Sequence, residues 1–443
     1  MKSLLLFIIY LVFSCSGIQA SSKSHRSKNE IKIAGIELRT SVRIGIFDNQ
    51  KPRIINYGQH DVTSYPSFIS FTDDNTFVGN RAVFEQVKNP ERTVSEITRF
   101  VGREFQDKAV QDLIKRVKYQ LVNKDNMPHV KITQKEQTKL YSSEELLSIL
   151  LNYGLENCRQ WLGYKAQSVV FTVPADFGLE RVDPFVKAAN QLNLITLDII
   201  DVPTAATIAY GLDDLKVNTN VLVFDFGADD LQVTVIKKAA QGYERIITKI
   251  NSKISGKDID DRILKLFLRK IKEEHNKELS PGKKNFDRFT SADEHAYAEV
   301  QRQSTQAKKD LQNPDRSETW IVVNGAGFNF VYEFKRQELE QITNDYPKAV
   351  TSTLDEVLRD SNLSKKDIAH VVLSGGSSNN LFVKDPIKSY FPNSTIYDRI
   401  LPEHVPAYGA TIWASRLPAS SRFISKKPIS QIQKNRLKKK FKK

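Results

Sequence analysis

The chain has 443 residues, enough for two core-building units or one large bilobed domain. Its 40% hydrophobic and 27% charged residues are ordinary for a soluble globular protein, so composition argues against a fibrous or wholly disordered chain. The formal charge of +14 is concentrated in residues 421–443, which hold ten Lys or Arg and no acid, and this clustering argues against a nucleic-acid partner.

Residues 1–20 have the pattern of a signal peptide. Lys2 precedes an apolar run from Leu4 to Phe13, and small and polar residues then lead to Ala20. The alternative, a membrane anchor, needs about 20 apolar residues, roughly twice what this run offers. No later segment is apolar enough to span a bilayer, so we expect no transmembrane segment. We expect the mature chain in the endoplasmic reticulum lumen or secreted.

Cysteine usage excludes an internal disulfide in the mature chain. Cys15 lies inside the predicted signal peptide, which leaves Cys158 alone. Cys158 lies in the helical pattern Leu146–Trp161, which supplies no His to activate it. We interpret it as a half-buried structural thiol.

Strand and helix patterns alternate through the first half of the chain and predict an α/β architecture. A polar stretch precedes the first pattern. The predicted strands are Ile31–Ile36, Val42–Phe47, Ser67–Phe71, Val169–Val173 and Ile195–Ile200, and the predicted helices are Ser143–Trp161, Leu179–Leu192 and Thr204–Tyr210.

A similar order of elements then begins again. The predicted strands are Val221–Phe226, Leu231–Lys237, Thr319–Val323, Phe328–Phe334 and Val371–Ser374, and the predicted helices are Asp258–Glu274, Glu294–Leu311, Arg336–Asp360 and Pro406–Arg416. Each half opens with a hairpin whose first strand ends in an acid, Glu37 or Asp225, and closes on a Pro-opened small-residue helix. We interpret the two halves as duplicated lobes; the alternative is coincidence between common α/β patterns.

Polar turns in two hairpins are candidate phosphate loops. Backbone N–H groups and a hydroxyl at such a turn can hold phosphate. Two facing turns, Glu37–Ser41 and Asp225–Asp230, would hold the phosphate chain of a nucleotide between them. Their carboxylates would order a Mg²⁺ ion through water, because Mg²⁺ keeps much of its hydration shell. Each turn taken alone is more often a plain hairpin.

Several colinear segments resemble the heat shock protein 70 family over about Ile33 to Ala414, nearly the whole mature chain. The segments are Tyr65-Pro66-Ser67, Arg99-Phe100-Val101-Gly102-Arg103, Val170–Ala175, Ile199–Leu212, Val221–Gln232 and Val371–Ser378. The resemblance implies a duplicated actin-like ATPase fold, with two lobes around a nucleotide cleft. It also implies ATP or ADP with Mg²⁺ as the cofactor, and work in protein folding and the stress response.

The resemblance implies a set of nucleotide-binding positions, with Asp225 contacting the metal through water. These positions are Glu37, Thr40, Ser41, Asp225, Gly227, Lys308, Gly375, Gly376 and Ser377.

The departures from the family pattern fall on the cleft, and no catalytic residue is intact. The first loop carries Arg39 where the family has a glycine that lets backbone approach phosphate. Thr98 replaces the catalytic lysine, Val202 replaces the glutamate of the signature segment, and Asp229-Asp230 add carboxylates that repel a triphosphate. Further departures are Gln232, Thr305, Lys309 and Asn379. We therefore expect ATP hydrolysis to be weak or lost.

The resemblance places one nucleotide-binding domain at 31–417, with a first lobe at about 31–216 and a second at about 217–417. We expect no peptide-binding domain of the family after it, so the chain resembles the microsomal members that keep only the ATPase core. Residues 418–443 form a basic tail, either solvated and disordered or in contact with an acidic partner or anionic lipid. No Lys-Asp-Glu-Leu-type signal is present.

Three functions remain open at this point. The first is a working chaperone ATPase or nucleotide-dependent co-chaperone. The second is a pseudo-ATPase that binds chaperones, co-chaperones or client proteins without nucleotide. The third, a small-molecule kinase of the same actin-like superfamily, has no supporting residue. Two glycosylation acceptors are expected, at Asn362 and Asn393.

Overall fold

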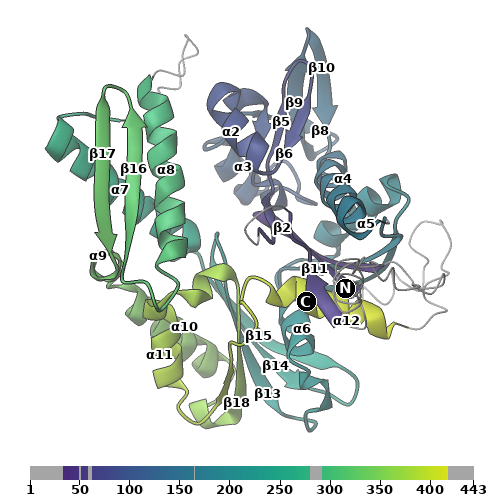
Figure 1. The fold of residues 1–443 in the computed structure, drawn as a ribbon. Helices are drawn as coiled ribbons and strands as arrows, with labels where there is room; N and C mark the ends of the chain where they lie inside the picture. Colours follow the sequence, from purple (N-terminus) through teal and green to yellow (C-terminus); the bar gives the residue numbers. More distant parts are fainter. Residues whose placement is uncertain (1–32, 49–50, 58–61, 164, 280–291, 418–443) are drawn as a thin grey trace, which may run out of the picture. The chain divides into compact units, whose positions relative to one another are not determined.

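The structure, a computed structural model, describes residues 33–48, 51–57, 62–163, 165–279 and 292–417 (Figure 1). The predicted signal peptide and basic tail lie outside these residues, and the predicted domain boundaries stay predictions. Within the described part the chain is a mixed α/β protein. No helix in the described ranges is long and apolar enough to cross a membrane.

Two large sheets carry the fold. The first contains β12 (Ile195–Asp201), β11 (Ser168–Val173), β1 (Ile33–Leu38), β2 (Ser41–Asp48) and β3 (Lys51–Ile54) in that order, with β4 (Tyr65–Pro66) paired to β2. The second contains β15 (Tyr243–Asn251), β14 (Leu231–Lys238), β13 (Asn220–Phe226), β18 (Ile368–Ser374) and β19 (Thr395–Tyr397) in that order.

The two large sheets share one pairing pattern. In the first, β1 is antiparallel to β2 and parallel to β11, which is parallel to β12. In the second, β13 is antiparallel to β14 and parallel to β18, which is parallel to β19. The third strand of each sheet, β3 or β15, adds antiparallel to the hairpin. The duplicated α/β fold predicted from the sequence is therefore confirmed.

The described residues also form three smaller sheets. They are β6 (Thr76–Val78) with β5 (Ile69–Phe71) and β7 (Thr93–Val94); β10 (Gln137–Tyr141) with β9 (Met127–Gln134) and β8 (Gln120–Lys124); and β16 (Glu318–Gly325) with β17 (Phe328–Lys335). The β16–β17 hairpin lies beside α8 (Ala292–Asp310), as Figure 1 shows.

Helices connect and cover the sheets. The α-helices besides α8 are α2 (Asn80–Lys88), α3 (Lys108–Ile114), α4 (Ser143–Leu162), α5 (Leu179–Gln191), α6 (Val202–Ala209), α7 (Gly256–His275), α9 (Arg336–Ile342), α10 (Tyr346–Asp360), α11 (Leu381–Tyr390) and α12 (Val405–Arg416). Short 3-10 helices are η1 (Pro90–Arg92), η2 (Ile97–Arg99), η3 (Leu212–Asp214), η4 (Lys365–Asp367) and η5 (Gly376–Asn379).

The apolar core is divided between the two large sheets. Every residue of β1 and β11 is buried, as are all residues of β13 after Asn220, which explains their nearly unbroken apolar sequences. One core cluster draws on residues 34–199 and another on residues 222–391. Each large sheet therefore organises its own core.

Helices α6 and α12, which end the two halves, cross each other. A Cβ atom at Gly409 of α12 would overlap the carbonyl oxygen of Ala205 in α6, so glycine is needed at this crossing. Gly35 of β1 faces Thr411 of α12 with no room for a side chain. The last helix of the chain thus packs on the first sheet, while α6 contributes Ala206 and Ala209 to a cluster with β13 residues.

One predicted helix is wrong as a single element. The segment Arg336–Asp360 forms two helices, α9 and α10, separated at Thr343–Asp345. Pro347 lies in the first turn of α10, has no N–H to donate to the carbonyl of Thr343, and its ring crowds that carbonyl. The Thr343 hydroxyl donates to the carbonyl of Leu339 at 2.7 Å and closes α9.

Candidate functional site

Two tight turns lie at matching places in the duplicated sheets. The first, after β1, is closed by the amide of Arg39 donating to the carbonyl of Ser41 at 3.0 Å. The second, after β13, is closed by the amide of Gly227 donating to the carbonyl of Asp230 at 3.0 Å. These are the two turns that the sequence singled out as phosphate loops.

An ion pair joins the two turns directly. Arg39 Nη1 donates to Asp225 Oδ2 at 2.8 Å, and the two side chains are only 16% and 4% exposed. The same guanidinium covers Gly227, because a Cβ atom there would lie 3.0 Å from Arg39 Nη2. Burial opposes charge on Arg39, but Asp225, Glu37 and Asp230 together raise the pKa of the guanidinium above its usual value. A fixed positive charge therefore stands between the turns.

The backbone of the first turn is held from outside the hairpin. Ser67 donates its hydroxyl to the carbonyl of Arg39 at 2.7 Å and its amide to the carbonyl of Thr40 at 3.0 Å. Ser41 pairs with Pro66 in the short strand β4. Thr40 and Ser41 thus sit in a turn whose carbonyls, rather than its N–H groups, are tied by the neighbouring segment.

Glu37 also has an internal partner. Arg43 Nη1 donates to Glu37 Oε2 at 3.0 Å, and both side chains are 8% exposed. Burial raises the pKa of Glu37, and the nearby charges of Arg43 and Arg39 partly offset that rise. The carboxylate that the first turn would offer to a hydrated metal ion is therefore held by a partner within the protein.

Asp229, in the second turn, belongs to an ionic cluster with residues of the other half of the chain. Arg99 Nη2 donates to Asp229 Oδ1 at 3.0 Å, and Lys257 Nζ lies 2.9 Å from the same oxygen. Glu96 Oε2 lies 2.8 Å from Arg99 Nε and 3.6 Å from Lys257 Nζ. Burial raises the pKa of Asp229, but the charges of Lys257 and Arg99 bring it below its usual value.

Asp230 is in the opposite electrostatic situation. Burial raises its pKa to about 6, with help from the neighbouring carboxylates of Asp225 and Asp229, although Arg39 acts against this rise. Oδ1 atoms of both Asp230 and Asp225 are buried, with no hydrogen-bond partner among the described residues. These two oxygens leave hydrogen-bonding capacity unused beside the Arg39–Asp225 pair.

The glycine turn after β18 and a buried lysine hold the remaining nucleotide-binding positions that the family resemblance implies, and we refer to them as the adenosine side. Lys308 Nζ donates to the carbonyl of Gly256 at 2.8 Å and lies 2.8 Å from Asp260 Oδ1, while burial lowers the pKa of Lys308. Ser377 donates its hydroxyl to the carbonyl of Gly227 at 3.1 Å. The structure therefore brings this side next to the second turn.

The two glycines of that turn differ in their surroundings. Gly375 has φ +77, and a Cβ atom there would overlap the carbonyl of Phe226. Gly376 is open, since its nearest neighbour would be Glu403 Cβ at 3.6 Å. Gly376 is thus the part of this turn that a ligand can approach.

The positions of the lost catalytic groups have structural roles instead. Val202 is 1% exposed in the first turn of α6, where Asp201 caps the helix by accepting from the Thr204 amide at 2.9 Å. The carbonyl of Thr98 accepts from Arg181 Nη2 at 2.8 Å. Neither side chain supplies a charge to the cleft.

Sequence reasoning missed most of the ionic cluster. Glu96 and Lys257 carried no motif, and Arg99 appeared only as part of a packing segment. Glu96 directly precedes η2 and has a left-handed backbone, φ 53, which is uncommon for a residue other than glycine. Contacts between Arg99 and Asp229 span 130 residues, so local pattern offers no signal for them.

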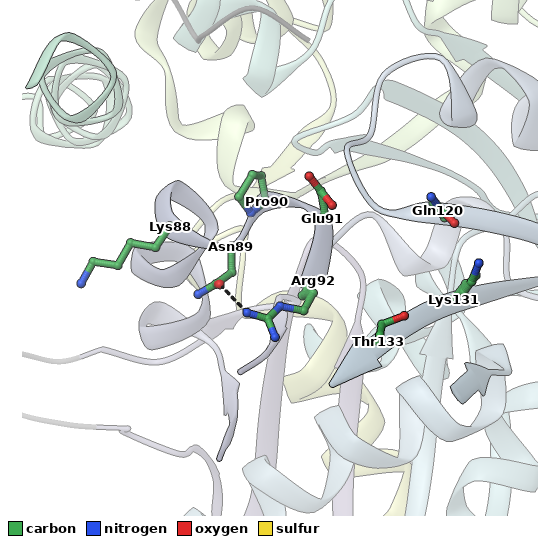
Figure 2. A pocket seen from close by; sticks show the side chains of 8 residues that line it. All are labelled: Lys88, Asn89, Pro90, Glu91, Arg92, Gln120, Lys131 and Thr133. Carbon is green, nitrogen blue, oxygen red and sulfur yellow. Dashed lines mark hydrogen bonds between the residues drawn. The ribbon is translucent and has the colours of Figure 1, made fainter. Parts of the chain in front are cut away.

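Two cavities lie away from these turns. One, of about 340 Å³, is shown in Figure 2, where Arg92 reaches Asn89 through a 2.9 Å hydrogen bond. Arg92 also pairs with Asp73 at 2.6 Å, so this cation already has acceptors. The other, of about 690 Å³, lies between the β8–β9 turn and the start of α4. A search of the described residues found no cluster of three or more His, Cys, Asp or Glu suited to a metal ion.

Comparisons with known proteins match nearly the same span as the fold. A family model described as "Hsp70 protein" matches residues 33–423. A "Heat shock 70 kDa protein" of Neurospora crassa is 30% identical over 400 residues, covering 90% of this chain and 60% of that protein. Its counterpart in Emericella nidulans is 30% identical over 385 residues, covering 86% and 58%.

A third relative gives the same picture. "Heat shock 70 kDa protein 2" of Paracoccidioides lutzii is 29% identical over 385 residues, covering 86% of this chain and 57% of that protein. The chain thus spans about three fifths of the length of the curated relatives it matches.

Proposed function

The chain belongs to the heat shock protein 70 family, and we propose that it serves that family's chaperone work as an interaction module that does not hydrolyse ATP. The observation that carries the proposal is the ion pair between Arg39 and Asp225, which joins the two candidate phosphate turns at 2.8 Å. Fold alone leaves the activity open, so the argument rests on the site.

The phosphate side of the cleft does not fit a magnesium triphosphate. Asp225 is the carboxylate expected to order the metal, and Arg39 already neutralises it. Gly227 is the glycine whose backbone would face phosphate, and the same guanidinium covers it. Removing Arg39 from this pair would leave a buried carboxylate uncompensated, which typically costs about 3–5 kcal/mol. Nucleotide would have to meet that cost before it gained any contact.

Charge in the second turn acts in the same direction. Asp230 and Asp225 each keep an unpartnered, buried oxygen on this side. Two like charges about 4 Å apart repel by roughly 1 kcal/mol in water and by more in a cleft of lower dielectric. A triphosphate placed there would be repelled unless Asp230 were protonated.

The chemical groups for hydrolysis are also missing. Phosphoryl transfer depends on positioned cations and on a group that orders the attacking water. Thr98 offers no cation, and Val202, buried in the first turn of α6, offers no acid. The adenosine side keeps Lys308 and the open Gly376, so weak, metal-independent contact with a nucleoside is compatible with the site.

The partners we propose are other chaperones, co-chaperones or client proteins, met in the endoplasmic reticulum lumen or outside the cell. The signal-peptide pattern of residues 1–20 supports this address, and family membership supports the class of partner. The basic residues of 421–443 provide a contact for an acidic partner or an anionic membrane surface.

A slow chaperone ATPase is the second candidate. Its support is the retention of Asp225, Gly227 and the Gly375-Gly376 turn at matching places in the duplicated fold. It requires the Arg39–Asp225 pair to open when nucleotide arrives.

Single-turnover hydrolysis separates the two candidates. Purified mature protein in excess over labelled ATP, with and without Mg²⁺, should release no phosphate above the buffer rate. Magnesium-dependent release that disappears in the Asp225→Ala variant would support the slow ATPase and overturn the proposal. The Lys115→Ala variant, which changes an exposed side chain just after α3, serves as the matched control.

A further inference from the structure

Two glycosylation acceptor sequences stand outside the site described above. Asn362-Leu363-Ser364 and Asn393-Ser394-Thr395 are the places where an asparagine is followed, two residues on, by Ser or Thr without an intervening proline. Such a sequence is modified only where the asparagine is reachable at the surface of a protein that enters the secretory pathway.

Asn362 is displayed at the end of a helix. It follows α10 with a left-handed backbone, φ 55, and is exposed. The backbone amide of Asn362 donates to the carbonyl of Arg359 at 3.1 Å, and the backbone amide of Leu363 donates to the carbonyl of Leu358 at 2.9 Å. The backbone on both sides is therefore fixed, while the carboxamide makes no side-chain hydrogen bond within the described residues.

Asn393 is displayed in a turn between α11 and β19. It is exposed, and the amide of Ser394 donates back to the carbonyl of Phe391 at 3.2 Å. The Ser394 hydroxyl donates to the carbonyl of Ile368, the first residue of β18, at 2.6 Å. In this turn too, the asparagine side chain has no hydrogen bond to any residue that the structure describes.

The two acceptors share one end of the second sheet. Asn362 precedes the start of β18 by six residues, and Asn393 precedes β19, whose first residue Thr395 pairs with His370 near the start of β18. The other end of β18 is Ser374, which pairs with Asp225 at the candidate cleft. Seven strand residues at about 3.3 Å each put roughly 20 Å between the two ends.

We propose that Asn362 and Asn393 carry N-linked glycans at the pole of the second lobe opposite the cleft. This proposal depends on entry of the chain into the secretory pathway, and on no other part of the proposed function. Glycans are bulky and strongly solvated. They would leave the cleft unobstructed and exclude the pole around the starts of β18 and β19 from protein docking. Partners would then bind elsewhere on the domain.

Cell-free translation of the full chain with endoplasmic reticulum microsomes tests the proposal. Protection from added protease reports translocation, and glycosidase treatment reports glycans as mobility steps. We expect a protected chain that shifts by two steps. Asn362→Gly keeps the left-handed backbone without an acceptor and should leave one step, as should Asn393→Gln, and the double variant should show none.

The control and the contrary outcomes are distinct. Ser394→Ala removes the bond to Ile368 but keeps an acceptor sequence, so it should still shift by two steps. A protease-protected chain that shows no mobility shift, or a single step that one variant abolishes, would show that the two asparagines do not both carry glycans. Either result would leave entry into the secretory pathway supported. A chain fully open to protease overturns that address and the glycans with it, but not the account of the cleft.

Discussion

At the level of single residues, Arg39 joins the turn after β1 to Asp225 at the end of β13, and the neighbouring acids divide into satisfied and unsatisfied groups. Asp229 has two cationic partners within 3.0 Å, Arg99 and Lys257. Asp230 follows it directly in sequence and keeps an unpartnered buried oxygen. Adjacent carboxylates thus contribute to stability with opposite signs.

Asp230→Asn should stabilise the protein at neutral pH. Burial raises the pKa of Asp230 to about 6, so the folded state binds a proton more tightly than the unfolded chain, whose carboxyl titrates near 3.8. The stability that protonated Asp230 provides is therefore present at low pH and is lost as pH rises through about 6. We expect the variant to gain roughly 1–3 kcal/mol at pH 7.5 and much less at pH 4, measured by urea unfolding.

Asp229→Asn is the matched control and should behave in the opposite way. Although burial raises its pKa, Lys257 and Arg99 bring it below the usual value, so its contribution is present at neutral pH and is lost as pH falls below about 4. We expect this variant to be less stable than the parent at pH 7.5. Equal shifts in both variants would contradict the assignment of these two environments.

The sequence predicted the disruptive residues but not their contacts. Arg39, Thr98, Val202 and the Asp229-Asp230 pair were identified as departures at their own positions. The partners were not predictable, because Arg39 and Asp225 are 186 residues apart and meet only once both sheets have formed.

At the level of elements, the ionic cluster connects η2 with the β13–β14 turn and α7. Arg99→Ala should lower the free energy of unfolding by about 1 kcal/mol at low salt, because it removes the ion pairs with Asp229 and Glu96, which join partly buried groups. The loss should shrink in 0.5 M NaCl, where charges are screened over a few ångströms. Urea unfolding at both salt concentrations measures it. The Lys115→Ala variant should change little, and a salt-independent loss in Arg99→Ala would show that packing rather than charge is responsible.

The crossing of α6 and α12 depends on Gly409. A methyl group there would overlap the carbonyl of Ala205, and both helices are fixed by their contacts with the two large sheets. We expect Gly409→Ala to lower the free energy of unfolding by at least about 2 kcal/mol, as overpacking does in closely packed cores. Thermal unfolding measures the change. Gly376→Ala, whose added methyl would meet nothing closer than 3.6 Å, is the control variant. Similar midpoints for both variants would contradict the close crossing.

Element prediction succeeded where apolar patterns are long and failed where they are short. The central strands β1 and β11 are buried throughout, as is β13 after Asn220, and their sequences are nearly unbroken apolar runs. The β8–β9–β10 sheet was missed, because its strands alternate with exposed Lys and Gln and bury one face only. The break between α9 and α10 was missed because Pro347 falls inside an otherwise periodic segment.

At the scale of the whole molecule, duplication explains why the site exists at all. Each large sheet has a hairpin turn after its central strand, β1 or β13, and the ion pair between Arg39 and Asp225 joins the two turns. The glycine turn after β18 lies beside the second of them, through Ser377 and Gly227. The three turns that the family resemblance assigns to nucleotide therefore lie together, and under the proposed function the charges placed on them oppose a magnesium triphosphate.

That scaffold was predictable from sequence, since repeated order and several colinear family segments indicated it. The closure of the cleft by the protein's own side chains was not predictable. Closure depends on distances between groups in different halves of the chain, such as Lys257 and Glu96 at 3.6 Å. Those distances are set by how the two sheets meet rather than by any local pattern.

Calorimetric titration of Mg²⁺·ATP into the mature wild-type protein, in parallel with the Arg39→Gly variant, tests the central claim most directly. Because Arg39 neutralises Asp225 and covers Gly227, the wild-type protein should give no binding heat at millimolar nucleotide, while Arg39→Gly should bind in a magnesium-dependent way. Micromolar, magnesium-dependent binding by the wild-type protein, abolished by Asp225→Ala, would contradict the account.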